Sequence, residues 1–159
     1  MNIILIAVGK IKEKFYVQAI EEYAKRLSRY CSLTTIEVPD EKAPENLSQA
    51  DMRIIIEKEG KKVISKIPAA ATVITLEIEG KQMTSVDFSK EIGDFALKGQ
   101  SQLCFIIGGS LGLSEEIKKL SQLKLSFSKM TFPHQLFRIM LLEQIYRSFR
   151  ILKNEPYHK

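Results

Sequence analysis

Cysteine and long apolar runs are both scarce in this chain, and each shortage excludes a class of protein. Only Cys31 and Cys104 occur, which is too few and too dispersed for a disulfide framework or a cysteine-based zinc site. This cysteine usage is typical of a reducing, cytoplasmic setting. No apolar run approaches the roughly 20 residues that a helix needs to cross a bilayer. No cluster of potential metal ligands occurs, so we expect neither a membrane protein nor a metal centre.

The N-terminus also lacks a feature, because residues 1–5 have no basic n-region and no small-residue cleavage site follows them. We therefore expect this segment to form a strand rather than a signal peptide. We find no internal repeat, no low-complexity tract and no second domain. With 159 residues, of which 45% are hydrophobic and 27% charged, the composition predicts one compact domain over residues 1–159.

The positive charge of the chain is concentrated near its C-terminus. Residues 124–159 carry seven Lys or Arg and two Glu, a net charge of +5, which equals the net charge of the whole chain. Residues 1–123 therefore balance to zero. A pI near 9.1 together with this concentration indicates a polyanionic partner.

Apolar runs of strand length alternate with segments of helical periodicity. Ser48, Ser85 and Ser114 are expected to cap helices, and Glu79-Gly80 is expected to form a turn after the third strand. The alternation predicts an α/β fold with a mostly parallel sheet. The expected strands are 2–8, 33–38, 72–78, 103–107 and 123–127, and the expected helices follow them, the last spanning 133–153.

The last predicted helix is apolar around most of its circumference, which is typical of a helix buried on more than one side. In so small a chain, one of those sides is expected to meet a second subunit, and Ile145 and Phe149 are candidates for the partner-facing side. The alternative is a helix central to a single core. We favour a homodimer.

Two loops after adjacent strands form the candidate ligand site. Gly108-Gly109-Ser110-Leu111-Gly112 follows one strand, and residues 126–135 follow the next. Glycine lets backbone approach a ligand closely, while Met130 and Phe132 suit the packing of a flat ring. The first loop is not G-x-G-x-x-G and no acidic residue ends the following strand, so a simple tight turn remains an alternative. The second loop has the alternative of a polar connection.

The chain ends on Tyr157-His158-Lys159, which offers an aromatic ring, an imidazole and a cation. A disordered end is the alternative, since termini are often disordered. His134, at the start of the last helix, is expected to hydrogen-bond locally, and Cys104 to fill the core.

Five strings resemble the ribosomal RNA large-subunit methyltransferase H family, which belongs to the SPOUT or α/β-knot methyltransferases. They are Val73–Glu77, Phe105–Ser110, Leu125–Gln135, Glu143–Arg147 and Pro156–Lys159. The resemblance implies a single domain with a C-terminal deep trefoil knot, S-adenosylmethionine as cofactor and a homodimer. It also implies methylation of N3 of a pseudouridine in 23S rRNA on the assembled ribosome. The residues alone predict an ordinary doubly wound sheet, because knots are essentially absent from default topologies.

The resemblance also implies roles for particular residues. His158 is the candidate base, Arg147 the candidate cation that lowers the imide pKa, and Tyr157 joins them as a third catalytic residue in the tail that closes over the partner's pocket. The positive charge of the segment, rather than the resemblance, makes Arg138, Arg150, Lys153 and Lys159 the expected RNA contacts. The expected cofactor-binding residues are Leu76, Gly108, Phe127, Ser128, Lys129, Met130, Thr131 and Phe132.

Two other functions stay open. A tRNA methyltransferase of the same superfamily would act on free tRNA rather than on whole ribosomes. A non-catalytic RNA- or nucleotide-binding module would not bind S-adenosylmethionine.

Overall fold

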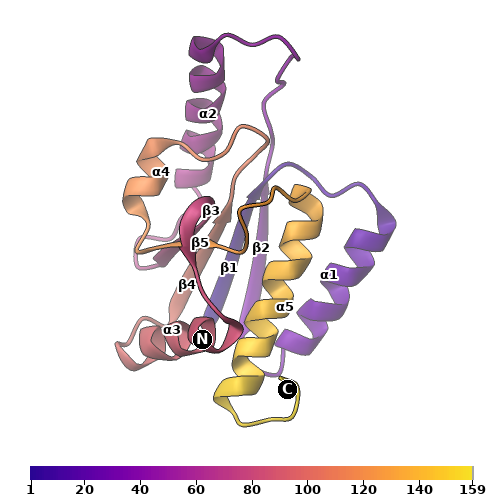
Figure 1. The fold of residues 1–159 in the computed structure, drawn as a ribbon, viewed down its shortest axis with the longest axis vertical. Coiled ribbons are helices and arrows are strands. Elements are labelled where there is room, and N and C mark those ends of the chain that lie inside the picture. The colour runs from indigo at the N-terminus through magenta and orange to yellow at the C-terminus, as the bar shows by residue number, and fades with distance from the viewer. Residues whose placement is uncertain (159) are drawn as a thin grey trace.

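The computed structural model describes residues 1–158, and Lys159 lies outside the described residues. Its centre is a five-stranded sheet in the order β2-β1-β4-β3-β5 (Figure 1), and every neighbouring pair is parallel. The parallel α/β fold predicted from the sequence is confirmed. The strands are β1 Asn2–Val8, β2 Ser32–Val38, β3 Thr72–Gln82, β4 Gln102–Ile107 and β5 Leu123–Ser126.

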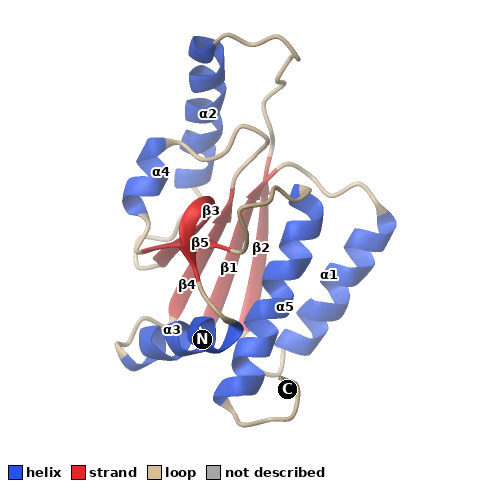
Figure 2. Cartoon of the chain, viewed as in Figure 1, coloured by secondary structure: helices blue, strands red, loops and turns tan. Residues whose placement is uncertain are grey.

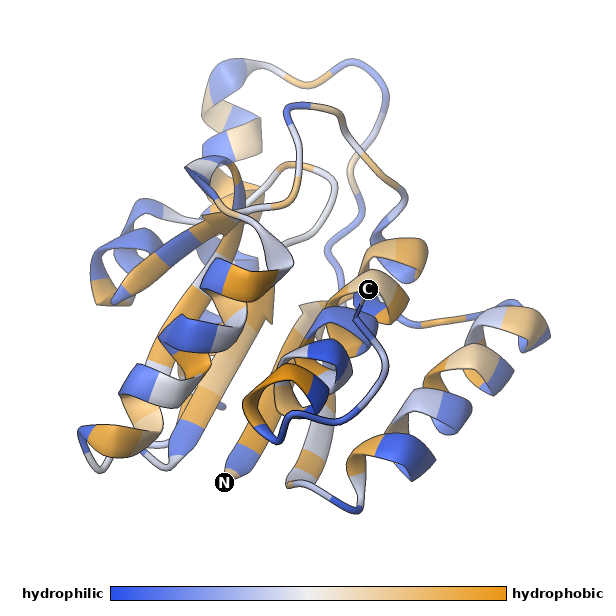
Figure 3. Cartoon of the chain, turned by 60° about the horizontal axis from the view of Figure 1, so that its bottom comes forward, coloured by the Kyte–Doolittle hydropathy of each residue, from blue (hydrophilic) through white to orange (hydrophobic). Residues whose placement is uncertain are grey.

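Helices lie on both sides of the sheet (Figure 2). The core cluster on one face joins the strands to α1, α3 and α5, and the cluster on the other face joins them to α2 and α4. Burial on two faces explains why the central strands are almost continuously hydrophobic (Figure 3). The helices are α1 Lys14–Leu27, α2 Gln49–Ile64, α3 Ser85–Leu97, α4 Glu115–Leu120 and α5 His134–Leu152.

Helix starts follow the predicted capping in two cases and differ in one. The Ser48 side chain accepts a hydrogen bond from Asp51 N at 3.1 Å, and Ser114 caps α4 in the same way. For α3, however, Thr84 is the cap and Ser85 is the first helical residue. Both residues can cap, so the shift is one position along the same short segment.

The predicted turn at Glu79 and Gly80 is wrong, because β3 continues to Gln82. The register of β3 against β5 shifts between Leu76 and Lys81, which is a bulge-like irregularity. A side chain at Gly80 would meet the β5 backbone at 2.8 Å. Glycine therefore permits a close approach of two strands here, where the sequence suggested a reversal.

Helix α5 is central to the core of its own chain. Ile145 is 0% exposed and Phe149 is 7% exposed, so the expectation that these two side chains face a partner is wrong. They belong to the cluster that packs α5 onto the sheet. Ile139 and Met140 are only half-buried, and they lie on a different side of the helix. Within residues 1–158, none of the helices is long and apolar enough to cross a membrane. The trefoil knot stays a prediction.

Candidate functional site

A cavity of about 1100 Å³ lies beside the carboxyl ends of β4 and β5. Its walls come from the loops after these strands, from part of β3, and from α2, α4 and the start of α5. It contains every predicted cofactor-binding residue except Lys129: Leu76, Gly108, Phe127, Ser128, Met130, Thr131 and Phe132. Residues that are more than fifty positions apart in the sequence thus meet at one cavity, while their binding of a cofactor stays a prediction.

The glycine turn after β4 closes on itself. Gly112 N donates a hydrogen bond to Gly109 O at 3.0 Å, and Gly112 has a φ of +89°, a conformation that suits glycine. A Cβ at Gly108 would lie 2.8 Å from Gly112 O. A side chain at Gly108 would therefore deform the turn itself, in addition to any crowding of a ligand.

The loop after β5 forms an apolar wall of the cavity. Phe137 of α5 packs against Phe127 with ring centroids 5.0 Å apart, and it stacks with Phe132 at 6.3 Å and 18°. Ser126 Oγ donates to Ile78 O at 2.8 Å, which fixes the start of this loop on β3. Met130 N donates to Ser128 Oγ at 3.0 Å. Flat aromatic faces next to hydroxyl groups suit a ligand that combines a planar ring with polar substituents.

Several cavity residues escaped the sequence reasoning. Arg53, Glu57 and Lys61 of α2 reach the cavity, and so does His134 of α5, for which only a local hydrogen bond was expected. Burial, followed by the charge of Arg138, lowers the pKa of His134, which favours its neutral form. Residues on α2 are polar and spaced as on any solvated helix face, so no sequence signal singles them out.

Arg138, an expected RNA contact, lies in the protein interior instead. Its side chain is 1% exposed, and its guanidinium pairs with Glu37 Oε1 at 2.8 Å. It also donates to Val8 O at 3.2 Å and to Gly9 O at 2.7 Å. Because every contact is internal, the prediction that Arg138 contacts RNA is wrong. A buried arginine needs such partners, and periodicity alone could not reveal them.

The other predicted RNA contacts lie near the end of α5. Arg150 pairs with Glu155 at 2.7 Å and donates to Tyr30 Oη at 3.2 Å, so its charge is partly offset. Lys153 is exposed, with Nζ 5.1 Å from the centroid of the Tyr30 ring. Lys159 lies outside the described residues. Among these predicted contacts, Lys153 is the one that the structure places in solvent with its charge available.

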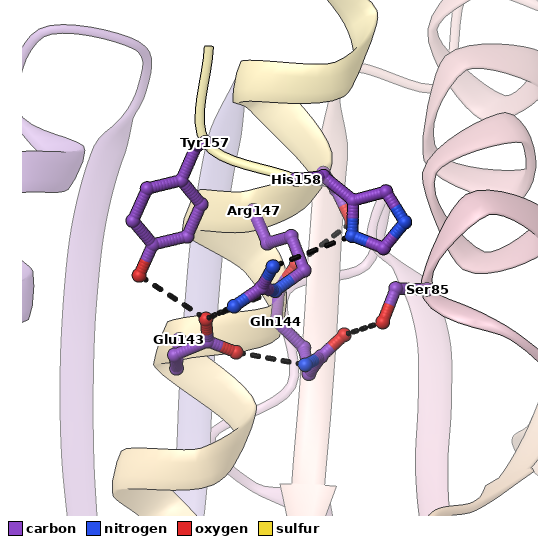
Figure 4. A network of polar contacts seen from close by, with 7 residues as sticks. Ser85, Glu143, Gln144, Arg147, Tyr157 and His158 are labelled. Carbon is purple, nitrogen blue, oxygen red and sulfur yellow. Dashed lines mark hydrogen bonds and ion pairs between the residues drawn. The ribbon is translucent and has the colours of Figure 1, made fainter.

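The C-terminal tail folds back alongside α5 of its own chain (Figure 4). Asn154 has a φ of +52°, a left-handed conformation that asparagine tolerates. Tyr157 Oη donates to Glu143 Oε1 at 3.2 Å, and the Tyr157 ring packs on Tyr146 with centroids 5.0 Å apart. The Arg147 Cζ atom lies 4.7 Å from the centre of the Tyr157 ring. An end of chain that the composition left open as disordered is thus held by aromatic and polar contacts.

Arg147 links the tail to Glu143. It donates to Glu143 Oε1 from Nη2 at 2.6 Å and from Nε at 3.0 Å, and this hydrogen bonding raises the pKa of Arg147. Its Nη1 lies 3.3 Å from His158 Nδ1. Arginine is only a donor, so Nδ1 must accept and the proton of a neutral His158 must lie on Nε2. In this arrangement, neither ring nitrogen has a free lone pair for a substrate proton.

A second hollow, of about 490 Å³, lies between α1, α3 and α5. Phe127 lines both this hollow and the larger cavity. Glu143 and Gln144 also line it, together with Ile139 and Met140, and Gln144 Oε1 accepts from Ser85 Oγ at 2.7 Å. The hollow therefore lies between the half-buried side of α5 and the loop after β5 that also lines the larger cavity.

A protein-family model described as a predicted SPOUT methyltransferase matches residues 1–158. The chain belongs to the SPOUT methyltransferase family. The resemblance stated from the sequence motifs is confirmed.

Individual members of the SPOUT family are similar over their full length. The chain is 60% identical over 159 residues to a ribosomal RNA large subunit methyltransferase H of Clostridium kluyveri, with 100% of both chains covered. A ribosomal RNA large subunit methyltransferase H 1 of Clostridium perfringens is 59% identical with the same coverage. A solved structure of a probable methylase family protein from Haemophilus influenzae has a TM-score of 0.55 at 9% identity, covering 99% of this chain and 70% of that one. That likeness concerns the fold.

The structure of this SPOUT chain brings the predicted cofactor residues together but keeps the predicted catalytic residues apart from them. Arg147, Tyr157 and His158 do not line the cavity that contains Gly108 and Phe132. They gather instead around Glu143 on α5. Within residues 1–158, no three His, Cys, Asp or Glu side chains form a group suited to a metal ion.

Proposed function

We propose that this SPOUT methyltransferase uses S-adenosylmethionine to methylate N3 of a pseudouridine in 23S rRNA of the assembled ribosome. The observation that carries the proposal is the cavity in which the glycine turn meets the aromatic loop after β5. The names of relatives that are about 60% identical over the whole chain support rRNA as the substrate class. The long motifs noted in the sequence support the finer assignment to a pseudouridine N3.

The residues present fit the proposed cofactor. Its adenine ring suits the apolar side chains of Leu76, Phe127 and Phe132, which lie in the same cavity. The backbone at Gly112 is exposed, and a Cβ there would meet no atom within 4 Å, so a ligand can approach the turn closely at this residue. The hydroxyl groups of Ser128 and Thr131 suit the polar substituents of a ribose. When bound, S-adenosylmethionine supplies an electrophilic methyl group on a positively charged sulfur.

The apolar walls have a chemical consequence for methyl transfer. Opposite charges are neutralised when a nitrogen anion takes a methyl group from a sulfonium. Water stabilises separated charges more than the neutralised transition state, so the exclusion of water by Phe127, Phe132 and Leu76 favours the step. The protein must also remove or weaken the imide proton at N3 before transfer.

We propose that the tail supplies this second function to the cavity of a partner subunit. Arg147, Tyr157 and His158 lie outside the cavity of their own chain, which supports a site shared between two chains. The hollow lined by Ile139, Met140 and Phe127 gives a second chain an apolar surface next to that cavity. His158 would accept the proton once it leaves Arg147, and the Arg147 guanidinium would stabilise the imide anion.

A methyl-transfer assay on ribosomes tests the proposal. Ribosomes from a strain that lacks the gene for this protein are incubated with the protein and with cofactor labelled in its methyl group. We expect label in 23S rRNA, and nuclease digestion with mass spectrometry should locate it on a pseudouridine. Free tRNA serves as the competing substrate. Label in tRNA alone would favour a tRNA methyltransferase, and cofactor binding without any transfer would favour a binding module.

A further inference from the structure

A buried carboxyl group on α2 packs directly against the glycine turn. Glu59 of α2 is 5% exposed, although its helix neighbours Glu57 and Lys61 reach the cavity. A Cβ at Gly109 would lie 2.8 Å from Glu59 Oε2 and 3.1 Å from Val8 Cγ1. The carboxyl group therefore fills the space directly against Gly109, and it limits how closely the turn can approach α2.

The next residue of α2 supports the far end of the same segment. A Cβ at Gly60 would lie 2.5 Å from Ser114 Oγ, and Ser114 is the N-cap of α4. Glu59 and Gly60 thus contact the beginning and the end of the stretch 109–114. Two consecutive residues of one rigid helix fix both ends of the turn that lines the cavity.

The other oxygen of Glu59 holds a different loop. Oε1 accepts a hydrogen bond from the backbone N–H of Glu41 at 2.9 Å. The Glu41 side chain pairs with Lys62 Nζ at 2.6 Å, and Lys62 Nζ also donates to Pro39 O at 3.3 Å. A single carboxyl group therefore contacts the glycine turn on one side and the loop 39–44 on the other.

The carboxyl group is costly to bury in this position. Glu59 Oε2 has no hydrogen-bond partner within residues 1–158. Burial raises the pKa of Glu59, the charges of Asp40 and Glu41 raise it further, and the Glu41 N–H and the charge of Lys62 oppose the rise. A group that served only to fill space would be more favourable as an apolar side chain. The presence of a carboxyl group at this position therefore points to a role other than stabilisation.

We propose that Glu59 is a positioning residue of the cofactor site. Its carboxyl group sets the distance between the Gly108–Gly112 turn and α2, and it links that turn to the loop 39–44. This inference rests on the proposed function, because it takes the turn to be the cofactor-binding loop. Glu59 does not line the cavity itself. It acts through Gly109, whose missing side chain leaves room for the carboxyl group.

A double-mutant cycle tests the contact. S-adenosylmethionine affinity is measured by calorimetry for the full-length protein and for Gly109→Ala, Glu59→Ala and the double variant. Gly109→Ala should weaken binding about tenfold, because the methyl group displaces a carboxyl group that is held by Glu41. In the Glu59→Ala background the same methyl group meets only Val8 Cγ1 at 3.1 Å, so the added loss should be at most about twofold. Glu21→Ala, on the exposed surface of α1, is the matched control and should not change the affinity.

Glu59→Gln separates positioning from general stability and covers the case in which Glu59→Ala does not fold. Glutamine keeps the shape and the acceptor for Glu41 N–H, so cofactor affinity should be retained. Glutamine also removes the titratable carboxyl group, so protonation at position 59 no longer contributes to the pH dependence of stability. A folded-state pKa raised above the ordinary 4.5 means that the folded protein binds the proton more tightly, so wild-type stability falls as pH rises above that value. The melting temperature of Glu59→Gln minus that of wild type should therefore grow with pH and then level off.

The outcomes are distinguishable. Strictly additive losses in the cycle, or a cofactor affinity in Glu59→Gln as weak as that in Glu59→Ala, would overturn the positioning role while leaving the proposed function intact. A wild-type protein that shows no binding of S-adenosylmethionine would overturn the proposed function, and this inference with it. Coupled losses in the cycle together with retained affinity in Glu59→Gln would support both.

Discussion

Arg138 of α5 donates a hydrogen bond to Glu37 of β2 at 2.8 Å, across 101 positions of sequence. The same carboxyl group accepts the backbone N–H of Ile11 at 3.1 Å, and Arg138 also donates to the carbonyl of Gly9. The pair therefore fixes the loop after β1 and the start of α5 at one edge of the sheet. His134 and Phe137, which precede Arg138 on α5, line the cavity, so this ion pair positions part of the candidate site.

Breaking this pair should cost stability rather than RNA affinity. Arg138 is 1% exposed and Glu37 is 34% exposed, so Arg138→Ala removes a buried, hydrogen-bonded side chain but leaves a partly solvated carboxylate, and it should lower the free energy of unfolding by about 2–3 kcal/mol. Urea denaturation measures the change. Lys153→Ala, at an exposed site on the same segment, is the control and should change stability by less than about 0.5 kcal/mol. A stable Arg138→Ala variant with weakened ribosome binding would restore the RNA role that the burial excludes.

The glycine turn allows a comparison between two glycines that share a left-handed backbone conformation. Gly112 has a φ of +89° and Gly99 has a φ of +76°, and a Cβ added to either residue would have no neighbouring atom within 4 Å. Alanine at each should cost roughly 1–2 kcal/mol of stability. We expect only Gly112→Ala to weaken S-adenosylmethionine binding, since Gly99 lies outside the cavity. Calorimetry measures both affinities, and equal effects would show that the turn has no special role.

The apolar side of α5 predicts a dimer with a different interface from the one that the sequence indicated. Met140→Glu should give folded monomers, because Met140 is half-buried and lines the hollow next to α3. Ile145→Glu should unfold the chain, because Ile145 is 0% exposed. Sedimentation and circular dichroism distinguish the two results. Leu97→Glu, at a side chain that is 87% exposed, is the control, and monomeric wild-type protein at micromolar concentration would contradict the dimer.

The tail should matter for methyl transfer more than for cofactor binding. Deleting residues 157–159 removes the contacts of Tyr157 with Glu143 and Tyr146, which contribute on the order of 1 kcal/mol. We expect S-adenosylmethionine affinity to stay within a few-fold, while methylation of ribosomes is largely lost. His158→Ala alone should reduce turnover more than ribosome binding if its imidazole accepts the proton. Wild-type methylation by the truncated protein would remove the tail from the catalytic step.

Ribosome affinity should fall as salt concentration rises, because basic side chains that contact phosphates release counterions. Lys153→Ala should reduce the slope of log affinity against log salt by about one. Arg150 should contribute less, since Glu155 already pairs with it. Filter binding at several salt concentrations measures both slopes, and a flat dependence for wild-type protein would exclude phosphate contacts by this segment.

The sequence predicted the elements well where a local pattern determines them. The apolar runs of β1 and β4 and the caps at Ser48 and Ser114 are local signals, and the structure has them in place. The turn prediction at Gly80 failed because the sequence alone does not distinguish a glycine that permits close contact between two strands from a glycine in a turn. The family motifs identified residues of the cavity that no single pattern would have joined.

Charged residues with interior roles could not be predicted. Glu59 lies among other charged residues of α2, where it looks like part of a solvated face, whereas Arg138 is a lone charge in an apolar stretch of α5. Their burial depends on contacts with β1, β2 and the glycine turn, which are distant in sequence. Tertiary contact, and not helical periodicity, decides such cases.

Mass spectrometry of 23S rRNA is the most direct measurement. Ribosomes from a strain that lacks this protein are compared before and after incubation with the purified protein and S-adenosylmethionine. We predict the gain of one methyl group at N3 of a pseudouridine in 23S rRNA, and a slower gain with the Gly112→Ala variant at a cofactor concentration near the wild-type Kd. An unchanged 23S rRNA in the presence of cofactor-bound wild-type protein would contradict the proposed function.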